Sequence, residues 1–449
     1  MKKLIAMTLA VMLAGMALTA CGDSSSSSSG GESSSAAQSS SSAETESTSG
    51  DESQADAGSD LKAPVADGAI DITQGMTENM LTRSILSEGD TTRLANKLKE
   101  AKDTSNDKTW NIVFLGDSIT AGSSAAGTKY NFVGLFTEWW KQNYNKKTII
   151  TNAGIGATNT YFGVHRADRD VLSKEPDIIF IEFINDSGDM FYEKTMESLI
   201  RKCLAYKSNP AVVLVEMSLD GGGNALEQHL PPAEKYGVPV LSYHDAIYPE
   251  VQAGNISFKS SKGRPGDKDG LSPDGTHPNN CGHAMVAQMI ENFIDKVAAT
   301  ADQAGEITPF DESSESLTGD VYKNAHISDT STKDFEVKDV KGFAEESTPW
   351  NFQNGWSAVN AGDTITFEME FRNLGMLYYK TVNGESGSVE VKVDDGEGVV
   401  VNGDFSGGWG DYTADTEIYS SDDTAKHTVT VTVLDGDKTN FEIHGWLVS

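Results

Sequence analysis

Five short runs of apolar and β-branched residues alternate with amphipathic stretches between about residues 86 and 298. The runs are apolar on both faces, which is typical of parallel strands covered by helices on two sides. The predicted strands are "WNIVFLGD" (110–117), "KTIITNAG" (147–154), "PDIIFIEF" (176–183), "PAVVLVEMS" (210–218) and "VPVLSY" (238–243). The predicted helices between and after them are 132–144, 167–173, 191–208, 231–237 and 282–300. The pattern therefore predicts an α/β/α three-layer sandwich around a parallel five-stranded sheet.

After about residue 305 the pattern changes to strict alternation of apolar and polar residues, interrupted by Gly, Asn and Asp turns. The alternating segments are "DTITFEMEF" (363–371), "GMLYYKTV" (375–382), "GSVEVKVDD" (387–395), "KHTVTVTVLDG" (426–436) and "NFEIHGWLVS" (440–449). This pattern predicts a C-terminal antiparallel β-sandwich over residues 325–449, with the domain boundary within 300–325. The last segment is apolar to its end, so we expect the C-terminus to be buried.

The first residues, "MKKLIAMTLAVMLAGMALTAC", have the organisation of a secretory signal. Two lysines precede an apolar run of about 17 residues, which is too short to favour a membrane span. "LTAC" resembles the lipobox of bacterial lipoproteins, and the resemblance implies a lipoprotein signal peptide over 1–20 and lipidation of Cys21. A plain secretion signal is the alternative. The implied location is the extracellular face of the cell membrane, with a lipid anchor as the only membrane contact.

Residues 21–60 are rich in serine, nearly devoid of apolar side chains and free of Lys and Arg. Such a segment cannot bury enough surface to fold, so it is predicted to be a disordered linker. The α/β domain is then expected to occupy residues 61–300.

The chain of 449 residues has a formal net charge of −32, and more than half of it lies in the linker and beyond residue 305. This balance makes nucleic acid an unfavourable partner and suits a soluble protein outside the cell. Besides Cys21, the two distant residues Cys203 and Cys281 predict neither a disulfide framework nor a metal site.

The carboxyl ends of parallel strands meet at one edge of a sheet, where ligands bind. Ser118 follows the first predicted strand, Gly154 and Gly156 follow the second, and Asn185 follows the third. These residues supply a hydroxyl, free backbone N–H groups and an amide donor.

Asp274 and His277 lie three residues apart in "SPDGTHPNN", directly before the last helix. A serine hydroxyl needs an adjacent base to become a nucleophile, and an imidazole oriented by a carboxylate suits that task. His165, His229 and His244 have no acidic residue at a useful sequence spacing, except Asp245 beside His244.

Four blocks in this order resemble the SGNH (GDSL-like) hydrolases: "GDSIT", "GIGAT", "FIND" and "DGTHP". The resemblance covers about residues 86 to 298. It implies that Ser118, His277 and Asp274 form a catalytic triad. It also implies an oxyanion hole made by the backbone N–H groups of Ser118 and Gly156 and the side chain of Asn185.

Several positions keep a second interpretation. Ser118 could be a helix cap, Asn185 could serve a local Asx turn, and Gly154 could replace Gly156 as the donor. The family often has Gly where this chain has Phe183, although "EF" before the asparagine also resembles a carbohydrate-esterase-like branch.

The role of the C-terminal aromatic residues is also open. They are Trp350, Trp356, Trp409, Tyr412 and Trp446. They could bind glycan, although most tryptophans of a small sandwich are core residues.

The sequence thus predicts an extracellular serine esterase acting through an acyl-enzyme, with acetylated carbohydrate as its expected substrate. No metal or organic cofactor is implied. The alternatives are a lipid or lysophospholipid esterase and a non-catalytic glycan-binding lipoprotein.

Overall fold

The computed structural model describes residues 67–449, except residues 104, 106, 333, 349 and 350. The predicted signal peptide, Cys21 and the serine-rich linker lie outside the described residues. The described chain consists of an α/β domain followed by an antiparallel β domain, as the sequence predicted.

A six-stranded sheet with strand order β1-β6-β5-β4-β2-β3 forms the centre of the α/β domain. Its strands are β1 (Ile85–Ser87), β2 (Trp110–Gly116), β3 (Thr148–Gly154), β4 (Ile178–Glu182), β5 (Ala211–Glu216) and β6 (Val240–Ser242). Strands β2 to β6 pair in parallel and confirm the predicted five-stranded sheet. The sixth strand, β1, is antiparallel to β6 at the edge and was not predicted. It is three half-buried residues long, so it gives no apolar run in the sequence.

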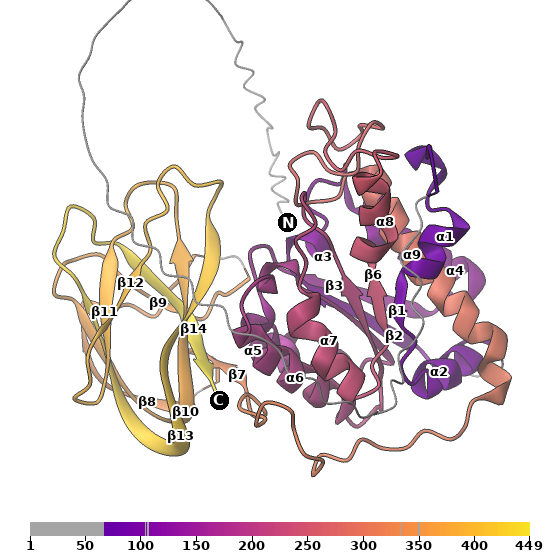
Figure 1. The fold of residues 1–449 in the computed structure, drawn as a ribbon. Helices are drawn as coiled ribbons and strands as arrows, with labels where there is room; N and C mark the ends of the chain where they lie inside the picture. Colours follow the sequence, from indigo (N-terminus) through magenta and orange to yellow (C-terminus); the bar gives the residue numbers. More distant parts are fainter. Residues whose placement is uncertain (1–66, 104, 106, 333, 349–350) are drawn as a thin grey trace, which may run out of the picture. The chain divides into compact units, whose positions relative to one another are not determined.

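Helices cover both faces of this sheet (Figure 1). One layer contains α1 (Glu78–Arg83), α2 (Thr92–Lys102), α4 (Phe132–Asn143), α8 (Tyr243–Gln252) and α9 (Asn280–Thr300). The other contains α5 (Thr160–Asp170), α6 (Phe191–Leu204) and α7 (Leu226–Lys235). The short helix α3 (Ser118–Ala121) directly follows β2, and 3₁₀ turns lie at Ile72–Gln74, Thr128–Tyr130, Leu172–Lys174, Ile184–Asp186 and Ala301–Gln303.

Several helices differ from the sequence prediction. Helix α5 begins at Thr160 and not at residue 167, because the Asn159 side chain accepts a hydrogen bond from the Phe162 N–H at 2.8 Å and caps the helix there. Helix α7 begins at Leu226 and not at residue 231, and it has Pro231 and Pro232 inside it. Helices α1, α2, α3 and α8 were not predicted, and α8 has Pro249 inside it.

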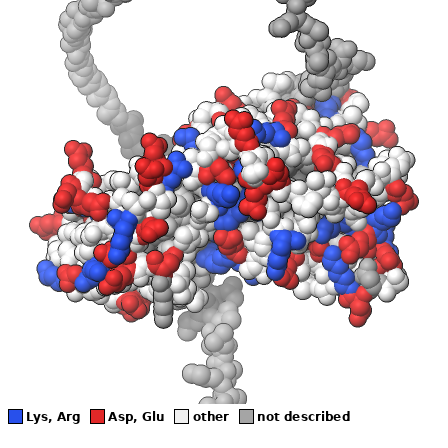
Figure 2. All heavy atoms as spheres, turned by 90° about the horizontal axis from the view of Figure 1, so that it is seen from below, with Lys and Arg blue, Asp and Glu red and all other residues white. Residues whose placement is uncertain are grey.

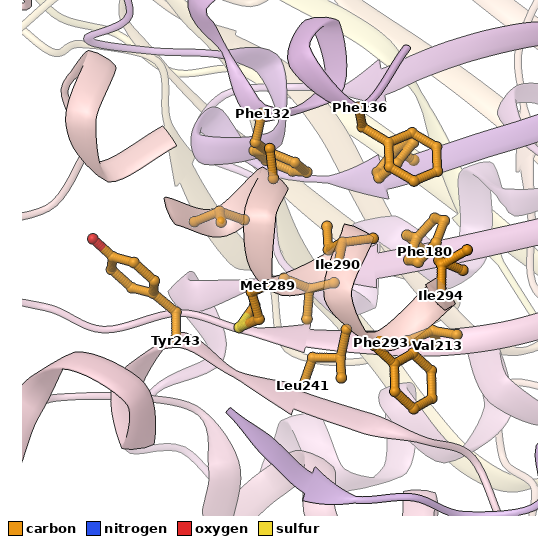
Figure 3. Close-up of a cluster of buried hydrophobic side chains, with 14 of the residues drawn as sticks. Phe132, Phe136, Phe180, Val213, Leu241, Tyr243, Met289, Ile290, Phe293 and Ile294 are labelled. Carbon is orange, nitrogen blue, oxygen red and sulfur yellow. The ribbon is translucent and has the colours of Figure 1, made fainter. Parts of the chain in front are cut away.

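A cluster of aromatic side chains packs against strand β2. The rings of Phe114 on β2 and Phe180 on β4 are stacked with centroids 4.6 Å apart. Phe132 and Phe136 of α4 meet Phe114 edge to face. Figure 3 shows these α4 rings and Phe180 converging with apolar side chains of α9. Because such a core is close-packed, the strand that carries the candidate nucleophile at its end is firmly positioned.

The C-terminal domain is an antiparallel sheet with strand order β12-β11-β13-β10-β14-β7, in which β8 also pairs with β10 and β9 with β14. Its strands are β7 (His326–Ser328), β8 (Phe335–Lys341), β9 (Trp356–Ala358), β10 (Thr364–Lys380), β11 (Ser388–Val393), β12 (Val399–Asn402), β13 (Tyr412–Val433) and β14 (Phe441–Val448). The segments at 363–371 and 375–382, predicted as separate strands, form the single strand β10. Two register shifts between Phe371 and Gly375 absorb the polar residues that had suggested a turn.

The final strand β14 is buried along most of its length, which confirms the prediction of a buried C-terminus. Trp356 and Trp446 are 1% and 0% exposed and belong to the core of the β domain. Trp409, in contrast, is 69% exposed and stacks on Tyr412 with ring centroids 4.8 Å apart. Trp350 lies outside the described residues.

The α/β and β domains share one apolar cluster. Leu377 of β10 and Leu447 of β14 pack in the same core as Phe162 of α5, and all three are fully buried. A polar contact lies beside it, where the Asn159 side chain donates to the Asp415 carboxylate on β13 at 3.2 Å.

On the face shown in Figure 2, acidic and basic side chains lie next to one another over the surface. That face offers no continuous basic area of the kind that binds nucleic acid. Within the described part of the chain, we find no helix long and apolar enough to cross a membrane.

Candidate active site

Ser118 is the first residue of helix α3 and stands at the carboxyl end of strand β2. The preceding Asp117 caps this helix by accepting a hydrogen bond from the Ile119 N–H at 2.9 Å. This contact fixes the turn before Ser118. It leaves the Ser118 hydroxyl half-exposed at the sheet edge and free to contact the loop before α9.

His277 bridges Ser118 and Asp274. Its Nε2 lies 2.9 Å from the Ser118 Oγ, and its Nδ1 lies 2.8 Å from Asp274 Oδ2. Because a carboxylate oxygen accepts, Nδ1 carries the proton and Nε2 is left to accept from the serine hydroxyl. The structure thus brings together the three side chains to which the sequence assigns a triad.

The turn that contains Asp274 orders its carboxylate. Asp274 Oδ1 accepts hydrogen bonds from the backbone N–H groups of Thr276 and His277, both at 2.9 Å. Partial burial opposes ionisation, but the hydrogen bonds from His277 and the backbone lower the pKa of Asp274 to about 2. Asp274 is therefore ionised at neutral pH and can stabilise a positive charge on His277.

The predicted amide donor, Asn185, lies at the end of β4 with an exposed side chain. Its Nδ2 donates one hydrogen bond to the Thr158 carbonyl oxygen at 2.8 Å, which leaves a second N–H of the amide available. Its backbone N–H points at Asp117 Oδ2 at 3.4 Å. These contacts join the third sequence block to the loop that follows β3 and to the turn before Ser118.

The geometry distinguishes the two glycines of that loop. The Gly154 N–H donates to the Asn152 side chain at 2.9 Å and is occupied. For the Gly156 N–H we find no acceptor in the described part of the chain, and a Cβ at this position would lie 3.7 Å from the Cβ of Ser118. Gly156 is therefore the better placed donor toward an oxyanion formed at Ser118.

Phe183, the departure from the family pattern, is accommodated by a glycine on the facing helix. Its buried ring lies against Gly163 of α5, where an added Cβ would approach the ring to 2.7 Å. The larger side chain thus occupies space left by Gly163 and does not displace Asn185 from Thr158.

Two carboxylates are buried beneath the candidate nucleophile. Glu182 accepts a hydrogen bond from the Thr120 hydroxyl at 2.7 Å, and Asp117 is also fully buried. Burial raises the pKa of Asp117 to about 6 and raises that of Glu182 well above its ordinary value. Neither carboxylate contacts Ser118 or His277 through a hydrogen bond in the structure described here.

His229 has no acidic residue at a useful spacing in the sequence, but the fold brings two carboxylates to it. Its two ring nitrogens contact Glu216 at 2.8 Å and Asp186 at 2.9 Å, and all three side chains are buried. The partners are 13 and 43 residues away, so local spacing could not reveal them. One signal was present: Glu216 is a charged residue at the end of an otherwise apolar predicted strand.

The described residues contain no group of three or more His, Cys, Asp or Glu side chains arranged to hold a metal ion.

Comparison with known proteins covers the part of the chain that contains this site. A model of the GDSL-like Lipase/Acylhydrolase family matches residues 114–285, which span all four sequence blocks. No curated protein matches the chain.

Among solved structures, the chain is similar to a two-domain esterase (CEX) active on acetylated mannans. The two chains are 32% identical, the likeness covers 82% of this chain and 98% of that one, and the TM-score is 0.73. A structure of such an esterase co-crystallized with mannopentaose gives 32% identity, coverage of 82% and 97%, and a TM-score of 0.72.

Proposed function

The chain belongs to the GDSL-like lipase/acylhydrolase family, and from this premise we propose that it is a serine esterase that removes O-acetyl groups from carbohydrate. Membership of the family and the likeness to a two-domain esterase make it an SGNH-type esterase. The observation that carries the proposed mechanism is the chain of hydrogen bonds from Ser118 through His277 to Asp274.

In the proposed reaction, the Ser118 Oγ attacks the carbonyl carbon of the ester while His277 Nε2 accepts the hydroxyl proton. Asp274 fixes the tautomer of His277 and stabilises the imidazolium. The negative oxygen of the tetrahedral intermediate is received by the N–H groups of Ser118 and Gly156 and by the Asn185 amide.

His277 then donates its proton to the leaving alcohol, and an acyl-enzyme remains on Ser118. Water, deprotonated by His277, attacks the acyl carbon and releases the acid, after which Ser118 regains its proton. Every proton in this cycle moves through His277.

Two observations favour carbohydrate over lipid as the substrate. The similar two-domain esterase is active on acetylated mannans. The exposed large apolar side chains of the described residues also come from separate segments of the chain: Tyr130, Ile149, Met190, Leu317, Val340, Val359, Val382, Val400 and Trp409. A lipid esterase would need a continuous apolar surface beside the nucleophile.

The test compares acetate release from a panel of acetylated glycans with hydrolysis of 4-nitrophenyl esters of increasing chain length. We expect acetylated glycans and short acyl esters to be preferred, and Ser118→Ala to reduce turnover to background. Ser313→Ala is the control, because the Ser313 hydroxyl donates to Asp311 at 2.6 Å, outside the triad. Retained turnover in Ser118→Ala would exclude the triad, and preference for long chains would indicate a lipid esterase.

We also propose that the protein is tethered to the outer face of the cell membrane through a lipid on Cys21. The support is the "LTAC" sequence before a serine-rich segment. Cys21→Ala should release active protein from the envelope fraction, which immunoblotting of cell fractions measures. A variant that stays with the envelope after a high-salt wash would contradict the lipid anchor.

A further inference from the structure

A buried ion cluster lies between helix α7 and the end of strand β4. His229 of α7 contacts Asp186 through Nε2 at 2.9 Å and Glu216 through Nδ1 at 2.8 Å. The three side chains are between 0% and 3% exposed. None of them takes part in the mechanism described above.

His229 is an imidazolium in this cluster. A neutral imidazole donates from only one nitrogen, whereas two carboxylates on opposite sides both require a donor. Burial opposes the charged ring, but the carboxylates of Glu216 and Asp186 outweigh that effect and raise the pKa of His229 to about 10. The charge neutralises part of the negative charge that would otherwise be buried there.

Asp186 connects the His229 cluster to the candidate oxyanion hole through hydrogen bonds. It directly follows Asn185 in the chain, and its Oδ1 accepts a hydrogen bond from the Thr160 N–H at 3.0 Å. Its other oxygen accepts from the Thr160 hydroxyl as well as from His229. Thr160 is the first residue of α5, two positions after Thr158, whose carbonyl oxygen holds the Asn185 amide at 2.8 Å.

One carboxylate therefore fixes the separation between the loop that carries Gly156 and the turn that carries Asn185. The two predicted oxyanion donors depend on that separation, because a displacement of about 1 Å in a reacting group can cost about 100-fold in rate. An Asp186 carboxylate without a cationic partner would also oppose a negative oxygen formed nearby, since such charges interact strongly in a poorly solvated site.

We propose that His229 is a positioning residue of the esterase: held by Glu216, it anchors Asp186 and thereby aligns the Asn185 amide and the Gly156 loop with the oxyanion. The inference rests on the proposed function, because it requires an oxyanion formed at Ser118.

The test uses His229→Gln in the full chain, with kcat and KM measured on a soluble acetyl ester. Glutamine keeps an amide donor but removes the charge and one of the two contacts. We expect kcat to fall by about 10- to 100-fold while KM stays within twofold. His165→Gln is the matched control, because His165 is equally buried, lies on α5, and makes its Nδ1 contact with the Tyr161 carbonyl oxygen at 2.7 Å instead of with Asp186.

A second measurement separates positioning from a general loss of structure. If His229 acts by aligning the Asn185 amide and the Gly156 loop, the double variant Asn185→Ala/His229→Gln should lose less kcat than the product of the two single losses. Additive losses, or a kcat for His229→Gln within twofold of the unsubstituted protein, would overturn the proposal. Loss of activity in Ser118→Ala together with either of these results would show that the esterase function stands and this inference fails.

Should His229→Gln not fold, Glu216→Gln decides the question. This substitution keeps the size of the side chain and leaves the contact between His229 and Asp186 in place. We expect an about three- to tenfold lower kcat with unchanged KM, and a smaller loss than this in the Asn185→Ala background. An unchanged kcat in Glu216→Gln would contradict the proposal.

Discussion

The Asn185 side chain has two amide N–H groups, and the Thr158 carbonyl oxygen occupies one of them. If the other stabilises the oxyanion, Asn185→Ala should lower kcat by about 10²- to 10³-fold, the usual loss for one oxyanion donor. Because the side chain is exposed, the free energy of unfolding should change little. Steady-state kinetics on an acetyl ester, with urea denaturation of the same variant, measures both quantities.

Asn280→Ala is a suitable control for this substitution. Asn280 also lies next to the site, where its Oδ1 accepts a hydrogen bond from the Ala126 N–H at 2.9 Å, but it makes no contact with Ser118 or Thr158. A loss of less than tenfold in Asn185→Ala, similar to that of the control, would leave Asn185 with the role of a turn residue.

Site residues could be predicted from the sequence where they belong to a short motif, or where they directly follow a predicted strand. Ser118, Asp274 and His277 are of this kind, because the order of the blocks marks them and the last two lie on one turn. The choice between Gly154 and Gly156 required the structure, since it depends on a hydrogen bond from Asn152.

His229 could not be found from its neighbours in the sequence. Its carboxylate partners meet it only when β4, β5 and α7 pack together, and a buried histidine in an amphipathic helix resembles an ordinary core residue. Long-range pairing of charged residues is set by the tertiary fold, and a single sequence contains no record of it.

At the scale of elements, the parallel strands β2, β4, β5 and β6 were predictable because they are buried and mostly apolar. Several of the elements that were missed are short or locally irregular. Strand β1 has three residues, α8 contains Pro249, and β10 continues through a polar bulge. In these cases packing against neighbouring elements outweighs the local preference of the sequence.

The packing of β14 against α5 leads to a prediction about the β domain. A chain that ends near residue 305 would lack Leu377 and Leu447 and would expose their apolar partners, among them Phe162. We expect this truncated protein to aggregate or to lose activity on both a 4-nitrophenyl ester and acetylated polymer. Light scattering and the two assays measure the outcome.

A point substitution tests the same contact without removing the domain. Leu447→Ala should lower the free energy of unfolding by about 2–5 kcal/mol, as expected for a fully buried leucine, whereas Val400→Ala at a position 61% exposed should have little effect. Full activity of the truncated protein on the small ester, with activity lost only on polymer, would contradict a structural role of the β domain in stabilising the α/β domain. It would favour a glycan-binding role.

For the whole molecule, the buried histidines predict how stability depends on pH. Burial lowers the pKa of His165 to about 3, against an ordinary value of 6.5. A group of this kind contributes stability that is present above pH 6.5 and is lost as the pH falls toward 3. For His229, whose pKa is raised to about 10, the stability is present below pH 6.5 and is lost as the pH rises toward 10.

The two histidines should therefore affect the free energy of unfolding in different pH ranges, His165 below pH 6.5 and His229 above it. His165→Gln should flatten the acid side, and His229→Gln the side between pH 7 and 8.5, each by up to about 1.4 kcal/mol per pH unit. Urea denaturation at half-unit intervals of pH measures the slopes. The alkaline window ends at 8.5 because burial raises the pKa of the Cys203 thiol from 9.0 to about 12, so unfolding releases its proton above that range. An alkaline slope equal in His229→Gln and His165→Gln would mean that His229 carries no proton in the folded protein at neutral pH.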